Sequence, residues 1–131
     1  MAASRRFMRA KASASLNLAP PPFLCYNTFK AVILMVKHII LWKLKEEHNS
    51  VPVKQAIKNE LEGLSGKIPG LVEIKVQISA LASSNADVML YSVFEDEKAL
   101  REYAVNPLHV YVADTFVRPF TQTRMCLDFE E

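Results

Sequence analysis

The chain of 131 residues has little cysteine, and its two cysteines, Cys25 and Cys126, lie far apart. A disulfide framework needs several cysteines in a short chain, and a structural zinc site needs closely spaced Cys or His ligands. The three histidines are also dispersed. The sequence therefore favours a reducing compartment and predicts no metal site and no cofactor. A weak magnesium site made of carbonyl and carboxylate oxygens remains an alternative.

The sequence also lacks an apolar run long enough to cross a membrane. The apolar stretch 29–42 is too short, and Lys30, Lys37 and His38 interrupt it. A transmembrane helix needs about 20 mostly apolar residues. We therefore predict no membrane partner.

Residues 1–34 lack acidic side chains, although they carry five basic ones. The whole chain has 16 basic and 14 acidic residues, so residues 35–131 hold 11 basic and 14 acidic residues and a net charge of −3. The overall positive charge is therefore no evidence for a nucleic-acid partner, and we predict none. RNA-binding domains of related topology also need a basic motif on the third strand, and residues 87–94 contain no basic residue.

The difference in composition between residues 1–34 and the rest predicts an N-terminal extension followed by one domain. Residues 1–34 show no sustained period, and three prolines follow Ala19 as a stiff break. We expect them to be a disordered extension, produced by translation upstream of Met35 or acting as an organellar targeting leader; a functional tail is the third alternative. Residues 35–131 form the predicted domain. We expect a cytoplasmic protein, or an organellar one if the leader is a transit peptide.

Hydrophobic periodicity predicts an α+β fold for this domain. Alternation predicts strands, and spacing near 3.6 predicts helices that begin after Ser50, Asp96 and Asn106. The predicted strands cover residues 36–45, 71–78, 87–94 and 120–129. The order β-α-β-β-α-β is ferredoxin-like, and right-handed crossovers place the first and third strands at the centre of a four-stranded antiparallel sheet.

Helices can cover only one face of such a sheet. Ile39, Leu41 and their neighbours on the other face are apolar and still need cover. Large exposed apolar patches mark interfaces. We therefore predict a homodimer in which two sheets close into an α+β barrel.

Four segments of the domain resemble one known family. They are Met-Val-Lys-His-Ile-Ile-Leu-Trp-Lys-Leu at 35–44, Gly-Lys-Ile-Pro-Gly-Leu at 66–71, Tyr-Ser-Val-Phe-Glu-Asp-Glu at 91–97 and Tyr-Ala-Val-Asn-Pro-Leu-His-Val at 103–110. In this order they resemble the stress-responsive dimeric α/β-barrel (Dabb) family over residues 35–130. The opening segment resembles the start of short microbial members, which favours Met35 as the first residue.

The resemblance implies a candidate site. The family includes plant stress proteins without an assigned reaction, bacterial proteins of unknown role and a cofactor-free polyketide cyclase. In that cyclase a tyrosine and a histidine bind the substrate and abstract a proton, and Tyr103 and His109 stand at the matching positions. His38 matches the cyclase's first-strand histidine, and Asp128 matches an acid beside the catalytic histidine.

Two positions depart from the cyclase. Leu61 stands where its first-helix tyrosine aligns, and Val88 where its third-strand histidine aligns. The resemblance therefore implies a different substrate. His38, Trp42 and Val88 are the candidate ligand contacts; the structural alternative is that His38 is a buried, hydrogen-bonded histidine and Trp42 a core residue.

The residues themselves suggest acid–base chemistry. His109 is the third residue of its predicted helix, whose positive end favours the neutral imidazole, a proton acceptor. Asp128 would fix the tautomer of His109 if the two are adjacent. Tyr103 would polarise a carbonyl or orient a phenol. The alternative is that His109 and Tyr103 are only structural.

Three hypotheses for function follow. The first is a homodimer that binds a small apolar or phenolic molecule, with cofactor-free acid–base activity of a cyclase or isomerase kind. The second is a non-catalytic stress or scaffold protein whose stability resides in its dimer. The third is a cofactor-free monooxygenase.

Overall fold

A computed structural model describes residues 33–131 of the chain. The extension predicted for residues 1–34 therefore lies, apart from its last two residues, outside the described part, as does Cys25.

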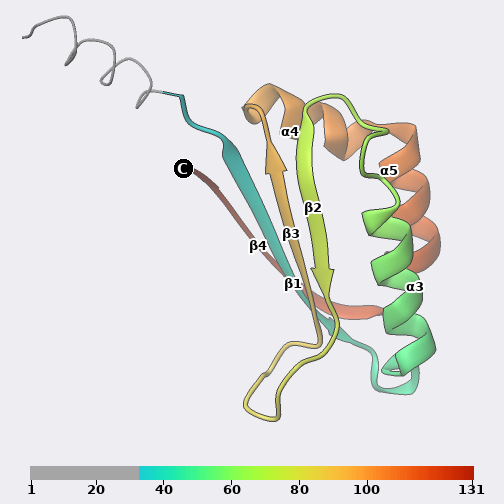
Figure 1. Ribbon diagram of the computed structural model, residues 1–131. Helices are drawn as coiled ribbons and strands as arrows, with labels where there is room; N and C mark the ends of the chain where they lie inside the picture. Colours follow the sequence, from blue (N-terminus) through green and yellow to red (C-terminus); the bar gives the residue numbers. More distant parts are fainter. Residues whose placement is uncertain (1–32) are drawn as a thin grey trace, which may run out of the picture. The chain divides into compact units, whose positions relative to one another are not determined.

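The predicted order β-α-β-β-α-β is confirmed (Figure 1). The elements are β1 (Val36–Leu44), α3 (Val51–Glu62), β2 (Leu71–Gln77), β3 (Val88–Phe94), α4 (Glu97–Val105), α5 (Pro107–Val112) and β4 (Thr121–Glu130). Helix α5 continues through a π-helical turn, Ala113–Val117, and a 3-10 turn, Arg118–Phe120. The helix was predicted to run regularly to about Val117. Its α-helical part ends at Val112, and Val117 is instead the last residue of the π-helical turn.

The four strands form one antiparallel sheet in the order β2-β3-β1-β4. The first and third strands are therefore central, as predicted. The register places His38 of β1 between Ser92 of β3 and Asp128 of β4. This pairing decides which side chains share a face, because strand residues alternate between the two faces.

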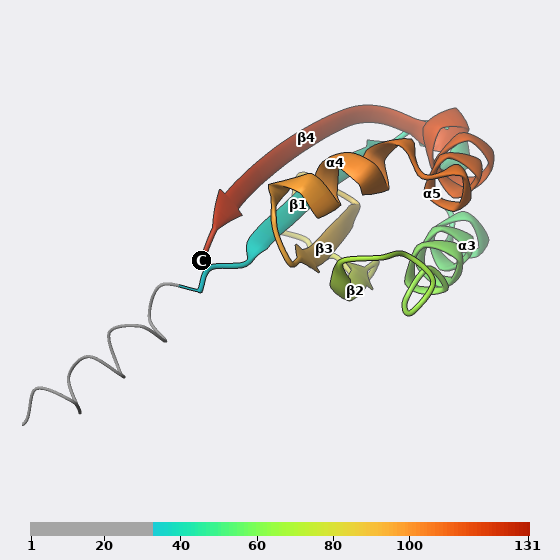
Figure 2. The ribbon, with the colours of Figure 1, turned by 90° about the horizontal axis from the view of Figure 1, so that it is seen from above.

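The helices cover one face of this sheet, on its concave side (Figure 2). The β1 residues Val36, Ile40, Trp42 and Leu44 are buried there. Ile57 and Leu61 of α3 join the same core. Burial of such aliphatic and aromatic side chains supplies most of the stabilisation, at about 25 cal/mol for each Å² of apolar surface.

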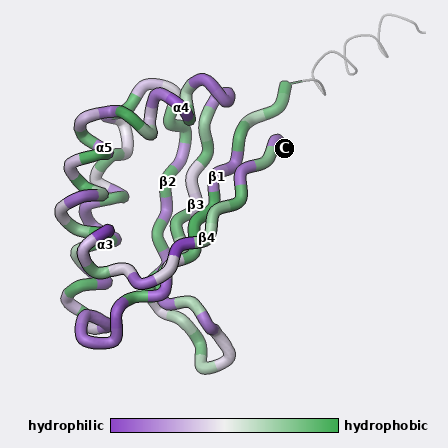
Figure 3. The backbone as a smooth tube through the Cα atoms, turned by 180° about the vertical axis from the view of Figure 1, so that it is seen from behind, coloured by the Kyte–Doolittle hydropathy of each residue, from purple (hydrophilic) through white to green (hydrophobic). Residues whose placement is uncertain are grey.

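The other face of the sheet is uncovered within residues 33–131 and carries apolar side chains on β1 and β4, beside charged ones such as Lys37 and Lys75. Met125 and Leu127 of β4 are 73% and 64% exposed, and Leu41 of β1 is 41% exposed. The register aligns Leu127 with Ile39 and Met125 with Leu41, so these four side chains share a face. Figure 3 shows how apolar residues recur along the strands.

Short polar residues begin the two helices that position the site. The Asp96 side chain accepts a hydrogen bond from Ala99 N at 2.7 Å, and the Asn106 side chain accepts one from Leu108 N at 2.9 Å. Both caps were predicted. Ser50 precedes α3 but makes no side-chain cap. Gly66 has the predicted left-handed backbone, φ 76°, although the regular part of α3 ends earlier, at Glu62.

Candidate functional site

A cavity of about 690 Å³ lies between the β1–β4 side of the sheet and the helices that cover it. Its apolar wall includes Ile40 and Trp42 of β1, Leu61 of α3 and Leu90 of β3. Polar side chains from β1, α4, α5, the turn after α5 and β4 complete the lining. A largely apolar pocket of this size with a few converging polar groups is typical of small-molecule sites.

Tyr103 and His109 meet at the joint between α4 and α5. Their ring centroids are 4.0 Å apart and the rings are tilted by 34°. Asn106 caps α5 between them and fixes the turn that brings them together. Tyr103 is only 2% exposed. The Tyr103 hydroxyl and His109 Nδ1 are both buried without a hydrogen-bond partner.

Such unpartnered atoms are costly. A buried polar group that has lost water without gaining a partner costs about 1–3 kcal/mol. Both atoms belong to residues that line the same cavity. A ligand with a polar group at this end of the cavity would supply the missing partners.

Burial controls the ionisation of both groups. Burial lowers the pKa of His109 below its ordinary value; the backbone carbonyls of Ala104 and Tyr103 oppose this shift in part, and the positive charge of Arg118 adds to it. Burial raises the pKa of Tyr103 well above its ordinary value. Near neutral pH His109 is therefore an uncharged proton acceptor and Tyr103 a protonated donor. The neutral form of His109 agrees with the sequence prediction, but its main cause is burial rather than the helix end.

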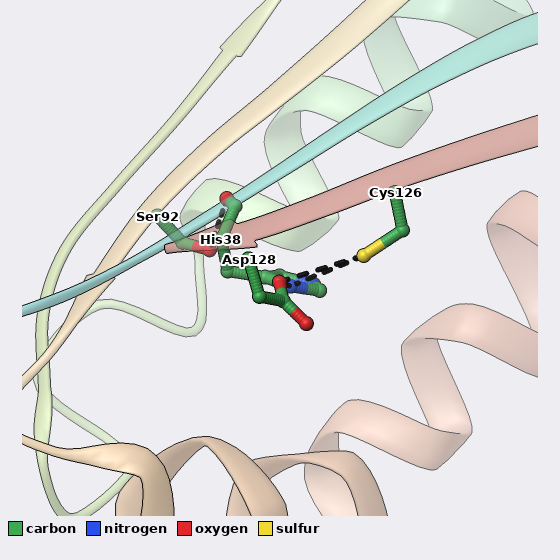
Figure 4. A network of polar contacts seen from close by, with 4 residues as sticks. All are labelled: His38, Ser92, Cys126 and Asp128. Atoms are coloured by element: carbon green, nitrogen blue, oxygen red, sulfur yellow. Dashed lines mark hydrogen bonds and ion pairs between the residues drawn. The ribbon is translucent and has the colours of Figure 1, made fainter. Parts of the chain in front are cut away.

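His38 lies on the buried face of β1 and is 6% exposed. Its Nδ1 is hydrogen-bonded to Asp128 Oδ1. Cys126 Sγ lies 3.7 Å from His38 Nδ1 and 3.5 Å from Asp128 Oδ1. Ser92 Oγ donates to the His38 carbonyl at 3.1 Å. Figure 4 shows these four residues, which come from three neighbouring strands.

The structure places most of the candidate residues around one cavity. His38, Trp42, Tyr103, His109 and Asp128 all line it. Asp128 was expected to bond to His109 if the two were adjacent. In the structure the Asp128 carboxylate is hydrogen-bonded to His38 instead.

Val88 lies apart from the other candidates. It is 2% exposed, belongs to the core cluster and is not among the residues that line the cavity. Its candidacy as a ligand contact rested on alignment alone and gains no support from the geometry.

Several lining residues were missed by the sequence prediction. Arg124 and Cys126 share a face of β4 with Asp128, Arg101 belongs to α4, and Arg118 begins the 3-10 turn that precedes β4. The period-two alternation of β4 placed Arg124 and Cys126 on the face of Asp128 and was the available signal.

One group of side chains has the donor set of a metal site. Ligand atoms of His38, Cys126 and Asp128 lie within 4.8 Å of one another. Imidazole, thiolate and carboxylate suit zinc and related ions. In the structure, however, His38 Nδ1 and Asp128 Oδ1 bond to each other.

The comparison with protein families agrees with this geometry. The model of the Stress responsive A/B Barrel Domain (Dabb) matches residues 36–131. The chain therefore belongs to the Dabb family, as its four segments predicted. No curated protein matches the chain.

Solved structures confirm the ferredoxin-like fold. A dimeric protein of unknown function from Bacteroides fragilis NCTC 9343 is 30% identical, with a TM-score of 0.68 over 74% of this chain and 96% of its own. A Dabb family protein from Mesorhizobium loti is 20% identical, with a TM-score of 0.60 over 73% and 95%. A hydroxynitrile lyase from Passiflora edulis is 17% identical, with a TM-score of 0.64 over 74% and 93%. The last two similarities concern the fold alone.

Membrane insertion was also predicted to be absent. No helix within residues 33–131 is long and apolar enough to cross a bilayer.

Proposed function

We propose that this Dabb protein binds a small, largely apolar or aromatic molecule in the cavity and carries out acid–base chemistry on it. The observation that carries the proposal is the pair of buried, unpartnered polar atoms, the Tyr103 hydroxyl and His109 Nδ1, in residues that line an apolar cavity. A purely structural tyrosine and histidine would find partners within the protein. This favours ligand binding over the scaffold hypothesis.

The protonation states define the reaction class. A neutral His109 accepts a proton from carbon next to a carbonyl, and the Tyr103 hydroxyl donates a hydrogen bond to the carbonyl oxygen, where negative charge develops. The raised pKa keeps that hydroxyl protonated. The products are an enolate held by Tyr103 and an imidazolium at His109. The imidazolium then returns its proton to a different atom, as in a cyclisation or an isomerisation.

The assembly we propose is a homodimer. The supporting observation is the uncovered apolar face that includes Leu41, Met125 and Leu127. Similar proteins from Bacteroides fragilis and Thermobifida fusca are described as dimeric. Two such faces packed together would bury these side chains and close the barrel. A stress role and a cytoplasmic location remain predictions.

Native mass spectrometry of protein purified from its source tests the ligand proposal. We expect the wild type to retain a small molecule and Ala104→Phe to lose it, because Ala104 lines the cavity and is exposed enough to accept the larger ring. Val105→Phe is the matched control, since Val105 is adjacent on α4, is 75% exposed and does not line the cavity. Equal occupancy in the two variants would contradict the assignment of the cavity.

A further inference from the structure

The polar end of the cavity carries more positive than negative charge. Three arginines line it, at positions 101, 118 and 124, whereas Asp128 is its one carboxylate. Asp128 is already hydrogen-bonded to His38. The cavity wall therefore holds more guanidinium groups than carboxylates.

Two of these arginines are already paired. Arg101 Nη1 lies 3.6 Å from Glu97 Oε2, and Arg118 is bonded to Asp114, each one helical turn away. Neither Glu97 nor Asp114 lines the cavity. Within residues 33–131, Arg124 forms no ion pair. It is thus the cavity arginine that pairs with no carboxylate of the protein, and it is exposed to solvent.

Arg124 lies on the face of β4 that lines the cavity. Arg124 is aligned with Trp42 of β1 and shares its strand face with Cys126 and Asp128. Its positive charge acts on Tyr103 and on Cys126, lowering the pKa of each against the larger effect of burial. A guanidinium and a phenol, both donors, therefore line the same cavity.

We propose, on the basis of the ligand function above, that the cavity takes a small amphipathic carboxylate, with its carboxylate bound by Arg124 and the Tyr103 hydroxyl left to the carbonyl oxygen of the reacting group. A carboxylate supplies two acceptor oxygens, and the planar guanidinium matches their geometry better than a point charge does. The apolar body of the ligand lies against Trp42 and its aliphatic neighbours. A neutral ligand would leave Arg124 unmatched.

A matched pair of probes tests this inference. The probes are 2-naphthoate and its neutral counterpart 2-naphthamide, which share shape and apolar area, and binding is measured by isothermal titration calorimetry on the full chain. We expect the wild type to bind the acid about tenfold more tightly than the amide, as a charge-assisted hydrogen bond provides. Arg124→Gln should remove this preference and leave amide affinity unchanged. Lys98→Gln is the control that should keep it, because it removes a positive charge from the same cavity-lining domain at a side chain of α4 that is 75% exposed and does not line the cavity.

Each outcome decides something. Equal binding of acid and amide by the wild type, or an undiminished preference in Arg124→Gln, overturns the carboxylate assignment and leaves the ligand cavity standing. Binding of neither probe overturns both the assignment and the ligand function. Circular dichroism of the two variants confirms that the fold is intact before binding is compared.

Discussion

His38 Nδ1 is hydrogen-bonded to Asp128 Oδ1 across the β1–β4 pair, although the two residues are 90 positions apart in the chain. They are aligned partners in the sheet, so the strand register itself sets the contact. His38 is buried, and its ring packs edge-on to Tyr103 at 6.3 Å between centroids. The hydrogen bond thus anchors the wall of the cavity against which Tyr103 is placed.

Asp128→Asn should lower the free energy of unfolding modestly. The bond to His38 loses its charged acceptor, and because the Asp128 side chain is 45% exposed we expect a loss of only about 0.5–1 kcal/mol. Urea denaturation monitored by circular dichroism measures it. Glu130→Gln, on the same strand face, is the control and should leave the midpoint unchanged. A midpoint for Asp128→Asn equal to wild type would show that the bond adds nothing to stability.

Tyr103→Phe should change the stability of the unliganded protein and its affinity for ligand in opposite directions. The variant removes a buried hydroxyl that has no partner, so the unliganded protein should gain up to about 1 kcal/mol of stability while ligand affinity falls. Tyr91→Phe is the control, because the Tyr91 hydroxyl accepts a hydrogen bond from Lys37 Nζ at 3.0 Å and its loss brings no gain. Thermal unfolding without ligand compares the two. A Tyr103→Phe protein less stable than Tyr91→Phe would mean that the hydroxyl has a partner after all.

His109 should make stability depend on pH. Its pKa is lowered in the folded state, so below the unfolded value of 6.5 the unfolded chain binds more protons than the folded one. Stability is therefore fully present above pH 6.5 and falls as the pH drops below it. His109→Gln should weaken this dependence, which is measured as the change in Tm between pH 7.5 and pH 5.5. An identical pH profile for wild type and His109→Gln would refute the burial argument.

A charged residue placed on the uncovered sheet face should disrupt the proposed dimer. Leu127→Lys should convert a dimer into a monomer, because Leu127 is 64% exposed in one chain and would be buried between two. Size-exclusion chromatography with light scattering measures the mass. Leu108→Lys is the control, since Leu108 is 48% exposed on α5, away from that face. A wild-type protein that elutes as a monomer would contradict the dimer proposal.

Local patterns were sufficient to predict most of the fold. Apolar residues on both faces of residues 36–45 and 87–94 marked the central strands, and Asp96 and Asn106 marked the helix starts, because capping and alternation act over a few residues. The regular part of α3 ends directly before Gly63, a local signal that the prediction passed over in favour of Gly66. The π-helical turn after α5 was not predicted.

The site was predictable only in part. The joint that brings Tyr103 to His109 is local, since both lie within one turn of Asn106, and the sequence indicated it. The contact of Asp128 with His38 depends on strand register across the whole domain. Alternation along β4 places Arg124 on the strand face of Asp128, but that this face lines a cavity depends on contacts between distant segments.

The central claim is that the α4–α5 joint binds a small molecule through Tyr103 and His109. Nuclear magnetic resonance of the histidine side-chain nitrogens tests it most directly, with the His109 signals assigned from His109→Gln and 2-naphthoate as the added ligand. We predict that the His109 resonances shift on binding and that those of His48 stay fixed. Saturable binding of 2-naphthoate with unchanged His109 resonances would contradict the claim.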